Sequence, residues 1–402
     1  MQRIFTLFIV GLLAIATVSF LVQYHLIIKS EQTRPFYLGV AFGGNTTAEA
    51  KLLIDRIKNY TNLFVVQSGP VSKNETSLNE IVGYAVASGL DVIVYFGWFD
   101  PDQQWRLPWV DMAKKRWGDR LLGLYLNDEP GGKQLDANWT GFFNRIKTQN
   151  RPTYQEHAPA IDAFINGSLP HSHDDAAKVY LSYLETGIGL DELKTRSIKA
   201  FTSDYALYWF DYLGGYDVML AQFGWNQSVT QEIALIRGAA RMQNKPWGAI
   251  ITWKYTEPPY LDSGQEVYNQ LRMAYEAGAE YGVIFNFPQI EDNEYGIMRN
   301  EHFEALEKFW NHVTSLSSLR SMPDYRRAEA VLVLPRNYGW GMRHPDDRIW
   351  GFWGPDENSA QIWEVSRKLL EQYGLRLDIV YEDPAFPVTG KYPRIYYWNP
   401  SI

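Results

Sequence analysis

Strand-length apolar runs and amphipathic helical segments alternate along most of this chain. In the first pair, residues 36–42 (FYLGVAF) form an apolar run, and residues 46–60 carry apolar side chains at helical spacing. Further strands are predicted at 63–67, 91–96, 121–126, 200–206, 217–222, 247–253 and 281–287, with helices at 77–88, 110–117, 230–243, 261–277 and 301–315. Such alternation is typical of a parallel sheet with crossover helices. Eight units predict a (β/α)8 TIM barrel over residues 35–320.

A smaller α/β domain is predicted at 325–402. Residues 330–334, 376–381 and 394–398 read as strands, and 359–373 as an amphipathic helix. A long aromatic and charged segment, 336–358, separates the first of these strands from the helix. Loops of this length in compact domains usually have a function. We expect this one to cap the barrel mouth or to form a homo-oligomer contact.

The amino-terminal residues 1–34 are predicted to be a membrane anchor and a short linker. Residues 4–28 are almost continuously apolar and long enough to cross a bilayer. No convincing cleavage site follows, so we favour an uncleaved signal anchor over a removed signal peptide. Six Asn-x-Ser/Thr triplets favour an extracytoplasmic, single-pass membrane glycoprotein; they begin at Asn45, Asn59, Asn74, Asn138, Asn166 and Asn226.

Composition excludes several classes of function. The chain has no cysteine, which excludes disulfides, thiol nucleophiles and cysteine metal sites. Its net charge of −8 and the absence of a basic block argue against a nucleic-acid partner. The run His171–Asp175 (HSHDD) lacks a spacing that fixes two metal ligands, so we interpret it as a helix cap. No nucleotide or dinucleotide fingerprint is present, and we predict neither a metal nor a cofactor.

Two acidic segments follow predicted barrel strands. The fourth strand stops at Asn127, and Asp128 and Glu129 come directly after it, before a Pro-Gly-Gly turn. Glu257 lies just beyond the seventh strand, and the nearby Lys254 is expected to keep its carboxyl ionised. Because active sites of such barrels lie at the carboxyl ends of the strands, we expect the acids to face each other across the mouth. Glycoside hydrolysis uses a carboxyl pair of this kind, and burial would raise the pKa of its acid.

Other polar and aromatic residues also follow predicted strands or flank the two acids. The polar groups would form hydrogen bonds with carbohydrate hydroxyls, and aromatic rings would stack on sugar faces. The predicted substrate-binding residues are Trp98, Asp100, Asn127, Asp204, Tyr205, Gln222, Trp225, Trp253, Lys254, Tyr255 and Asn286.

The barrel, with acids after strands four and seven and Trp253 ending the seventh, resembles the retaining (β/α)8 glycoside hydrolases. The runs 128–132 (DEPGG) and 252–268 (TWKYTEPPYLDSGQEVY) are also similar to those of archaeal exported proteins of unassigned activity. The carboxyl-terminal unit resembles the flavodoxin-like domain that follows the barrel in some β-galactosidases. One departure from the hydrolase pattern is that Asp128, not Asn127, directly precedes Glu129.

The Asp-Glu pair is also similar to that of substrate-assisted N-acetylhexosaminidases. That resemblance implies Glu129 as acid/base and Asp128 as the group that orients a substrate acetamide, with Glu257 only binding. The two-carboxylate mechanism instead assigns both Glu129 and Glu257 to catalysis. From another class, a non-catalytic protein that binds glycan or assembles at the cell surface is the alternative. We therefore expect a glycosidase-like protein with a carbohydrate substrate.

Overall fold

The computed structural model describes residues 36–136, 170–225, 227–287, 293–315 and 325–399, with isolated positions between 144 and 166. The predicted anchor, residues 4–28, lies outside these ranges. Within them, every helix is too short or too polar to cross a membrane.

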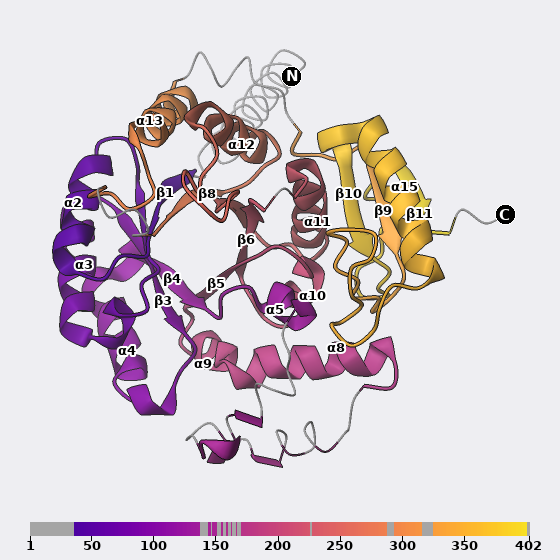
Figure 1. Ribbon diagram of the computed structural model, residues 1–402, viewed down its shortest axis with the longest axis horizontal. Coiled ribbons are helices and arrows are strands. Elements are labelled where there is room, and N and C mark those ends of the chain that lie inside the picture. The colour runs from indigo at the N-terminus through magenta and orange to yellow at the C-terminus, as the bar shows by residue number, and fades with distance from the viewer. Residues whose placement is uncertain are drawn as a thin grey trace, which may run out of the picture. The chain divides into compact units, whose positions relative to one another are not determined.

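Eight parallel strands close into a barrel in sequence order, which confirms the predicted fold (Figure 1). The closure joins the first and last strands in parallel, with Tyr37 opposite Tyr281. The seventh strand ends at Ile251, two residues earlier than predicted. The strands are β1 (Tyr37–Phe42), β2 (Leu63–Val66), β3 (Asp91–Gly97), β4 (Leu121–Leu126), β5 (Lys199–Asp204), β6 (Val218–Phe223), β7 (Trp247–Ile251) and β8 (Tyr281–Asn286).

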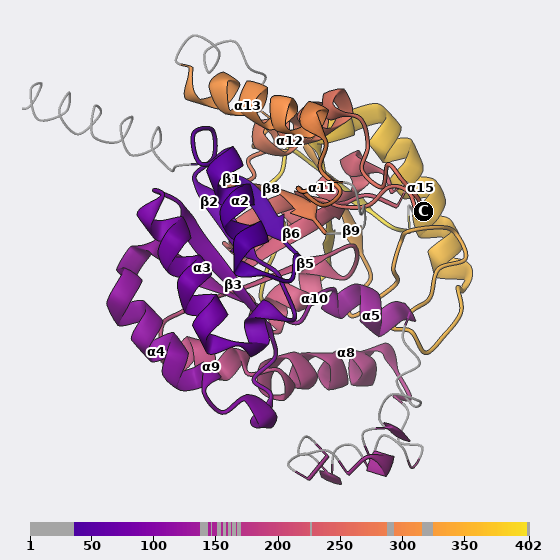
Figure 2. The same ribbon diagram turned by 60° about the vertical axis from the view of Figure 1, so that its left-hand side comes forward.

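Helices surround the barrel, and side-chain caps fix where several of them begin (Figure 2). Thr46 and Glu49 form a capping box at α2, and the Ser172 hydroxyl accepts from the Asp175 amide at α8. The α8 cap confirms our interpretation of the HSHDD run. The helices are α2 (Thr47–Ile57), α3 (Glu75–Ala87), α4 (Arg106–Trp117), α5 (Pro130–Asp136), α8 (His173–Ser182), α9 (Leu190–Thr195), α10 (Tyr208–Leu213), α11 (Val229–Met242), α12 (Gly264–Glu276) and α13 (Asn300–Thr314).

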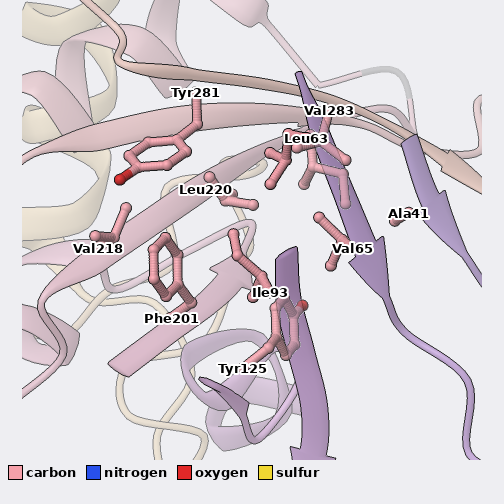
Figure 3. Packing of buried hydrophobic residues seen from close by; sticks show 11 residues of the cluster. Ala41, Leu63, Val65, Ile93, Tyr125, Phe201, Val218, Leu220, Tyr281 and Val283 are labelled. Carbon is pink, nitrogen blue, oxygen red and sulfur yellow. The ribbon is translucent and has the colours of Figure 1, made fainter. Parts of the chain in front are cut away.

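Alternate residues of the strands fill the barrel interior (Figure 3). Side chains in a strand point to opposite faces in turn, so every second residue enters the core. Gly123 lets β4 approach β5, because a β-carbon there would lie 2.6 Å from the Phe201 ring. The interior cluster consists of Ala41, Leu63, Val65, Ile93, Tyr125, Phe201, Val218, Leu220, Ile250, Tyr281 and Val283.

The carboxyl-terminal residues form a three-stranded parallel sheet in the order β10-β9-β11, as the sequence predicts for its three strands. These are β9 (Ala330–Leu334), β10 (Leu377–Tyr381) and β11 (Arg394–Tyr397), with α15 (Glu357–Tyr373) following β9. The sheet packs on α11, where Arg237 Nε donates to Asp378 Oδ1 over 2.7 Å. Gly238 allows close packing, since a β-carbon there would lie 2.5 Å from the Ile379 carbonyl oxygen.

Candidate active site at the barrel mouth

The two adjacent acids follow β4 in a tight turn. Asn127 and Glu129 both have left-handed backbone conformations, with φ of 48° and 56°. Residues other than glycine rarely adopt such angles, and those that do are often found at functional sites. The Glu129 amide donates to the Ser203 carbonyl of β5 over 3.0 Å, which ties the turn to the neighbouring strand. The half-buried Glu129 side chain is thereby held at the carboxyl edge of the barrel.

Asp128 lies among polar groups from three strands or strand ends. Its Oδ1 accepts from the Tyr125 hydroxyl, and it lies 3.4 Å from both Ser203 Oγ and Gln67 Nε2. Tyr125 OH and Ser203 Oγ are themselves 2.7 Å apart. A carboxylate supported by several donors has a fixed orientation. We call Gln67, Tyr125, Asp128, Glu129, Ser203 and Gln222 the acid cluster.

Gln222 connects Glu129 to the same cluster. Its Nε2 donates to Glu129 Oε1 over 2.9 Å and to Ser203 Oγ over 3.0 Å. Burial and the nearby Asp128 carboxylate raise the pKa of Glu129 above its ordinary value. A carboxyl with a raised pKa holds its proton at higher pH, as a general acid must. The expectation that burial raises the pKa of Glu129 agrees with this environment.

Asp204 supports the acid turn from behind. It is completely buried, and its carboxylate accepts from the Gly131 and Gly132 amides over 2.5 and 2.9 Å. Burial raises the pKa of Asp204 to about 7, although these backbone donors act in the opposite direction. The side chain therefore lies behind the mouth instead of pointing into it, which differs from the sequence-based expectation.

Glu257 lies in an exposed segment after β7. Together with Trp225, Lys254, Tyr255 and the following Thr256, Pro258 and Pro259, it lines a groove of about 510 Å³. Lys254, which was expected to act on the Glu257 carboxyl, pairs through its ammonium group with Asp262 over 2.7 Å. Among the described residues, no hydrogen bond joins the Glu257 side chain to the acid cluster. A joint catalytic role for Glu129 and Glu257 stays a prediction.

Aromatic side chains line the mouth beside β6, β7 and β8. The Trp253 ring centre lies 6.1 Å from that of Trp225 and 6.4 Å from that of Phe285. Trp225 and Tyr255 are 43% and 42% exposed, unlike most large aromatic residues of the described chain. Exposed rings that line one groove form a surface on which a ligand ring can stack.

The other predicted binding residues have local structural contacts. The Trp98 carbonyl accepts from Arg106, and the Asp100 carboxylate accepts from the Asp102 amide. The Asn286 side chain accepts from the Ile297 amide over 3.0 Å. Asn127 bonds the Tyr183 hydroxyl, and Tyr205 OH donates to Asp136. Their contact with substrate stays a prediction.

Three members of the acid cluster were missing from the sequence prediction: Gln67, Tyr125 and Ser203. Strand periodicity contains the signal that identifies them. Val65 and Phe201 are core residues, and the next inward positions are Gln67, just beyond the end of β2, and Ser203 on β5. Tyr125 itself belongs to the core cluster, and its hydroxyl reaches the acids. Counting by two along each strand, toward its carboxyl end, leads to this polar layer.

The described residues contain no group of three or more His, Cys, Asp or Glu side chains arranged to hold a metal ion. The acid cluster itself contains two carboxyls together with hydroxyl and amide groups. They can exchange protons and hold hydroxyl groups of a ligand.

Comparison with known proteins gives distant similarities. No protein-family model matches the sequence, and no curated protein does. An active-site mutant of Rhizomucor miehei beta-1,3-glucanosyltransferase in complex with laminaritriose is 13% identical (TM-score 0.40; 66% of this chain, 94% of that chain). A psychrophilic glycoside hydrolase family 10 endo-beta-1,4-xylanase is 14% identical (0.38; 68% and 97%). Orotidine 5'-monophosphate decarboxylase from Methanocaldococcus jannaschii is 10% identical (0.33; 70% and 99%). Distant matches thus include glycoside hydrolases among other TIM-barrel enzymes, and the similarity concerns the fold alone.

Proposed function

We propose that this protein cleaves glycosidic bonds, with Glu129 as the general acid. The observation that carries this proposal is the acid cluster, in which Gln222 orients Glu129 and three other side chains surround Asp128. Burial and the Asp128 charge raise the pKa of Glu129. Protonation of a leaving-group oxygen requires such an acid.

Two mechanisms use Glu129 with different partners. In the two-carboxylate mechanism Glu257 attacks the anomeric carbon or activates water. In the substrate-assisted mechanism Asp128 orients a substrate acetamide, whose oxygen attacks instead. The fixed orientation of Asp128 favours the second mechanism, because an orienting group must itself be held still.

Aryl α- and β-glycosides and aryl N-acetylglycosides test the activity. Variants Glu129→Gln, Asp128→Asn and Glu257→Gln would be compared with Glu329→Gln, a control far along the chain whose carboxylate forms an exposed ion pair. Loss of turnover in Glu129→Gln and Asp128→Asn, with activity kept in Glu257→Gln, is expected for substrate assistance. Equal loss in Glu129→Gln and Glu257→Gln would support the two-carboxylate mechanism. Unchanged turnover in Glu129→Gln would refute the proposal.

The exposed aromatic residues favour a second candidate, glycan binding without catalysis. Trp225 and Tyr255 line the groove with Lys254 and Glu257, whose charged groups can bond hydroxyls. Affinity electrophoresis in soluble polysaccharides would show retardation that Trp225→Ala removes. Tyr397→Ala, which alters an exposed ring on β11, is the matched control. Retardation without turnover on any glycoside would favour this candidate.

We also propose that the protein acts outside the cytoplasm, held by residues 4–28. The described sequon asparagines Asn45, Asn59, Asn74 and Asn166 are exposed, as attachment of a glycan requires. Mass spectrometry of the native protein would detect glycans at these sites. Full accessibility of the barrel to a protease added to intact cells would test its side of the membrane.

A further inference from the structure

Helix α5 begins directly after Glu129, so its position determines where the acid lies. The helix has only seven residues, and helices this short are not stable alone. Asp204 holds its first turn through the Gly131 and Gly132 amides. Its other end contacts the carboxyl-terminal loop, which we define as residues 335–356, between β9 and α15. α5 lies beside α10 in both ribbon views, with this loop next to it (Figures 1 and 2).

Arg343 of the carboxyl-terminal loop clamps the last residue of α5. Its Nη1 and Nη2 donate to the two Asp136 carboxylate oxygens over 2.7 and 2.9 Å. The same guanidinium donates to Asp347 over 2.8 and 2.6 Å. Asp347 is 1% exposed and Arg343 11%, so the guanidinium is held from the loop side. Paired donors of this kind fix direction as well as distance.

Two further contacts join α5 to the loop. Gln134, itself buried, donates through Nε2 to the Trp350 carbonyl over 2.8 Å. The backbones also approach closely, because a β-carbon on Gly351 would lie 2.1 Å from the Gln134 carbonyl oxygen. The Arg343 guanidinium also lies 5.5 Å from the centre of the Tyr205 ring, whose hydroxyl bonds Asp136. The loop therefore contacts α5 through backbone, amide and charged groups together.

We propose that the carboxyl-terminal loop positions Glu129 by clamping α5, with Arg343 as the principal positioning residue. The strained turn at Glu129 needs such support, since a left-handed residue persists only where its surroundings hold it. The role of Glu129 as acid rests on the proposed function, whereas its position and titration do not. The loop that positions Glu129 thus belongs to the carboxyl-terminal domain and not to the barrel.

Electrostatics give the clamp a measurable signature. The Asp136 carboxylate acts to raise the pKa of Glu129. Burial acts to raise the pKa of Asp136 itself, but the bonds and charge of Arg343 outweigh it and leave that pKa below its ordinary value. Removing Arg343 leaves the negative charge of Asp136 uncompensated. The charged and titratable groups that interact with Glu129 or Asp136 are Asp128, Lys133, Asp204, Tyr95, Tyr125, Tyr205, Arg343 and Arg348.

Titration of the Glu129 carboxyl by carbon-13 NMR in the full-length protein tests the proposal without a substrate. The resonance is assigned by its loss in Glu129→Gln. We expect the pKa of Glu129 to rise in Arg343→Gln and to fall in Asp136→Asn. Arg376→Gln, which breaks an exposed ion pair in the same carboxyl-terminal domain, should leave it unchanged. Identical titration of Glu129 in all these variants would overturn the proposal.

Two additional measurements separate positioning from general structural loss. Hydrogen exchange of the amides in residues 127–136 should accelerate in Arg343→Gln but not in Arg376→Gln. If Arg343→Gln does not fold, Asp136→Asn decides, since it keeps the buried Arg343–Asp347 pair. Where glycosidase turnover is found, Arg343→Gln should lower kcat on the order of 10- to 100-fold with a smaller change in KM. Absence of turnover would refute only the proposed function.

Discussion

Replacing Asp378 by asparagine should destabilise the docking of the carboxyl-terminal sheet on the barrel. Asp378 is completely buried and accepts from Arg237 Nε over 2.7 Å, Tyr392 OH over 2.9 Å and Arg241 Nη1 over 3.2 Å. Arg237 is 3% exposed, so the substitution leaves its positive charge buried without a carboxylate. Removing one partner of a buried ion pair costs about 3–5 kcal/mol.

The remaining contacts of Arg237 place the expected loss near the lower end of that range. Its guanidinium still donates to the Leu377 and Tyr325 carbonyls, each over 2.8 Å. We therefore expect a free energy of unfolding lower by about 3 kcal/mol, a large share of the ~5–15 kcal/mol typical of a folded protein. Urea unfolding followed by circular dichroism and tryptophan fluorescence measures this change.

Two comparisons make the result decisive. Glu329→Gln breaks the ion pair with Arg376, whose partners are 48% and 47% exposed, and should cost less than about 1 kcal/mol. The double variant Arg237→Met, Asp378→Leu should recover most of the loss, because apolar residues remove both buried charges. A loss below about 1 kcal/mol in Asp378→Asn would refute the reasoning.

Three further predictions concern a buried carboxyl, a glycine in α5 and the cap of α8. Burial raises the pKa of Glu232 to about 8 from an ordinary 4.5, so the folded state holds this proton more tightly than the unfolded one. Stability from the protonated form is complete below pH 4.5 and is lost as the pH rises toward 8; Glu232→Gln should flatten this decline in urea midpoints. Gly132→Ala would place a β-carbon 2.1 Å from the Tyr205 ring and should cost about 1–3 kcal/mol by urea unfolding, whereas Gly83→Ala, with open space around it, should be neutral or stabilising. Ser172→Ala removes the α8 cap and should lower the free energy of unfolding by about 1 kcal/mol; an unchanged urea midpoint would contradict this.

The barrel could be predicted from the sequence because its strands are short runs of mostly apolar residues. Strands such as β2 (LFVV) and β6 (VMLAQF) are buried on both sides and read as apolar runs between turns. The end of β7 could not be predicted as well, since nothing in the run WGAIITW shows that the strand ends at Ile251. Pairing partners depend on tertiary packing and not on local sequence.

The acids after β4 could also be predicted, but their surroundings could not. The sequence does not show that Lys254 pairs with Asp262 instead of Glu257, because both carboxylates lie within eight residues of the ammonium group. Nor does it show that Arg343, more than two hundred residues after Asp136 along the chain, contacts α5. Contacts between distant segments follow from the fold and have no local sequence signal.

Strand direction explains why similar residues at strand ends have different roles. On β5, Phe201 faces the interior, so Ser203 faces it as well and reaches Asp128, while Asp204 faces the opposite way. The outward carboxyl is covered by the loops and bonds the amides of α5. Glu129 differs because it lies beyond the strand, in a turn that keeps its carboxyl half-buried and bonded to the inward-facing Gln222. Counting by two from the core residues Phe201 and Leu220 therefore indicates that Ser203 and Gln222 reach the interior layer, whereas Asp204 does not.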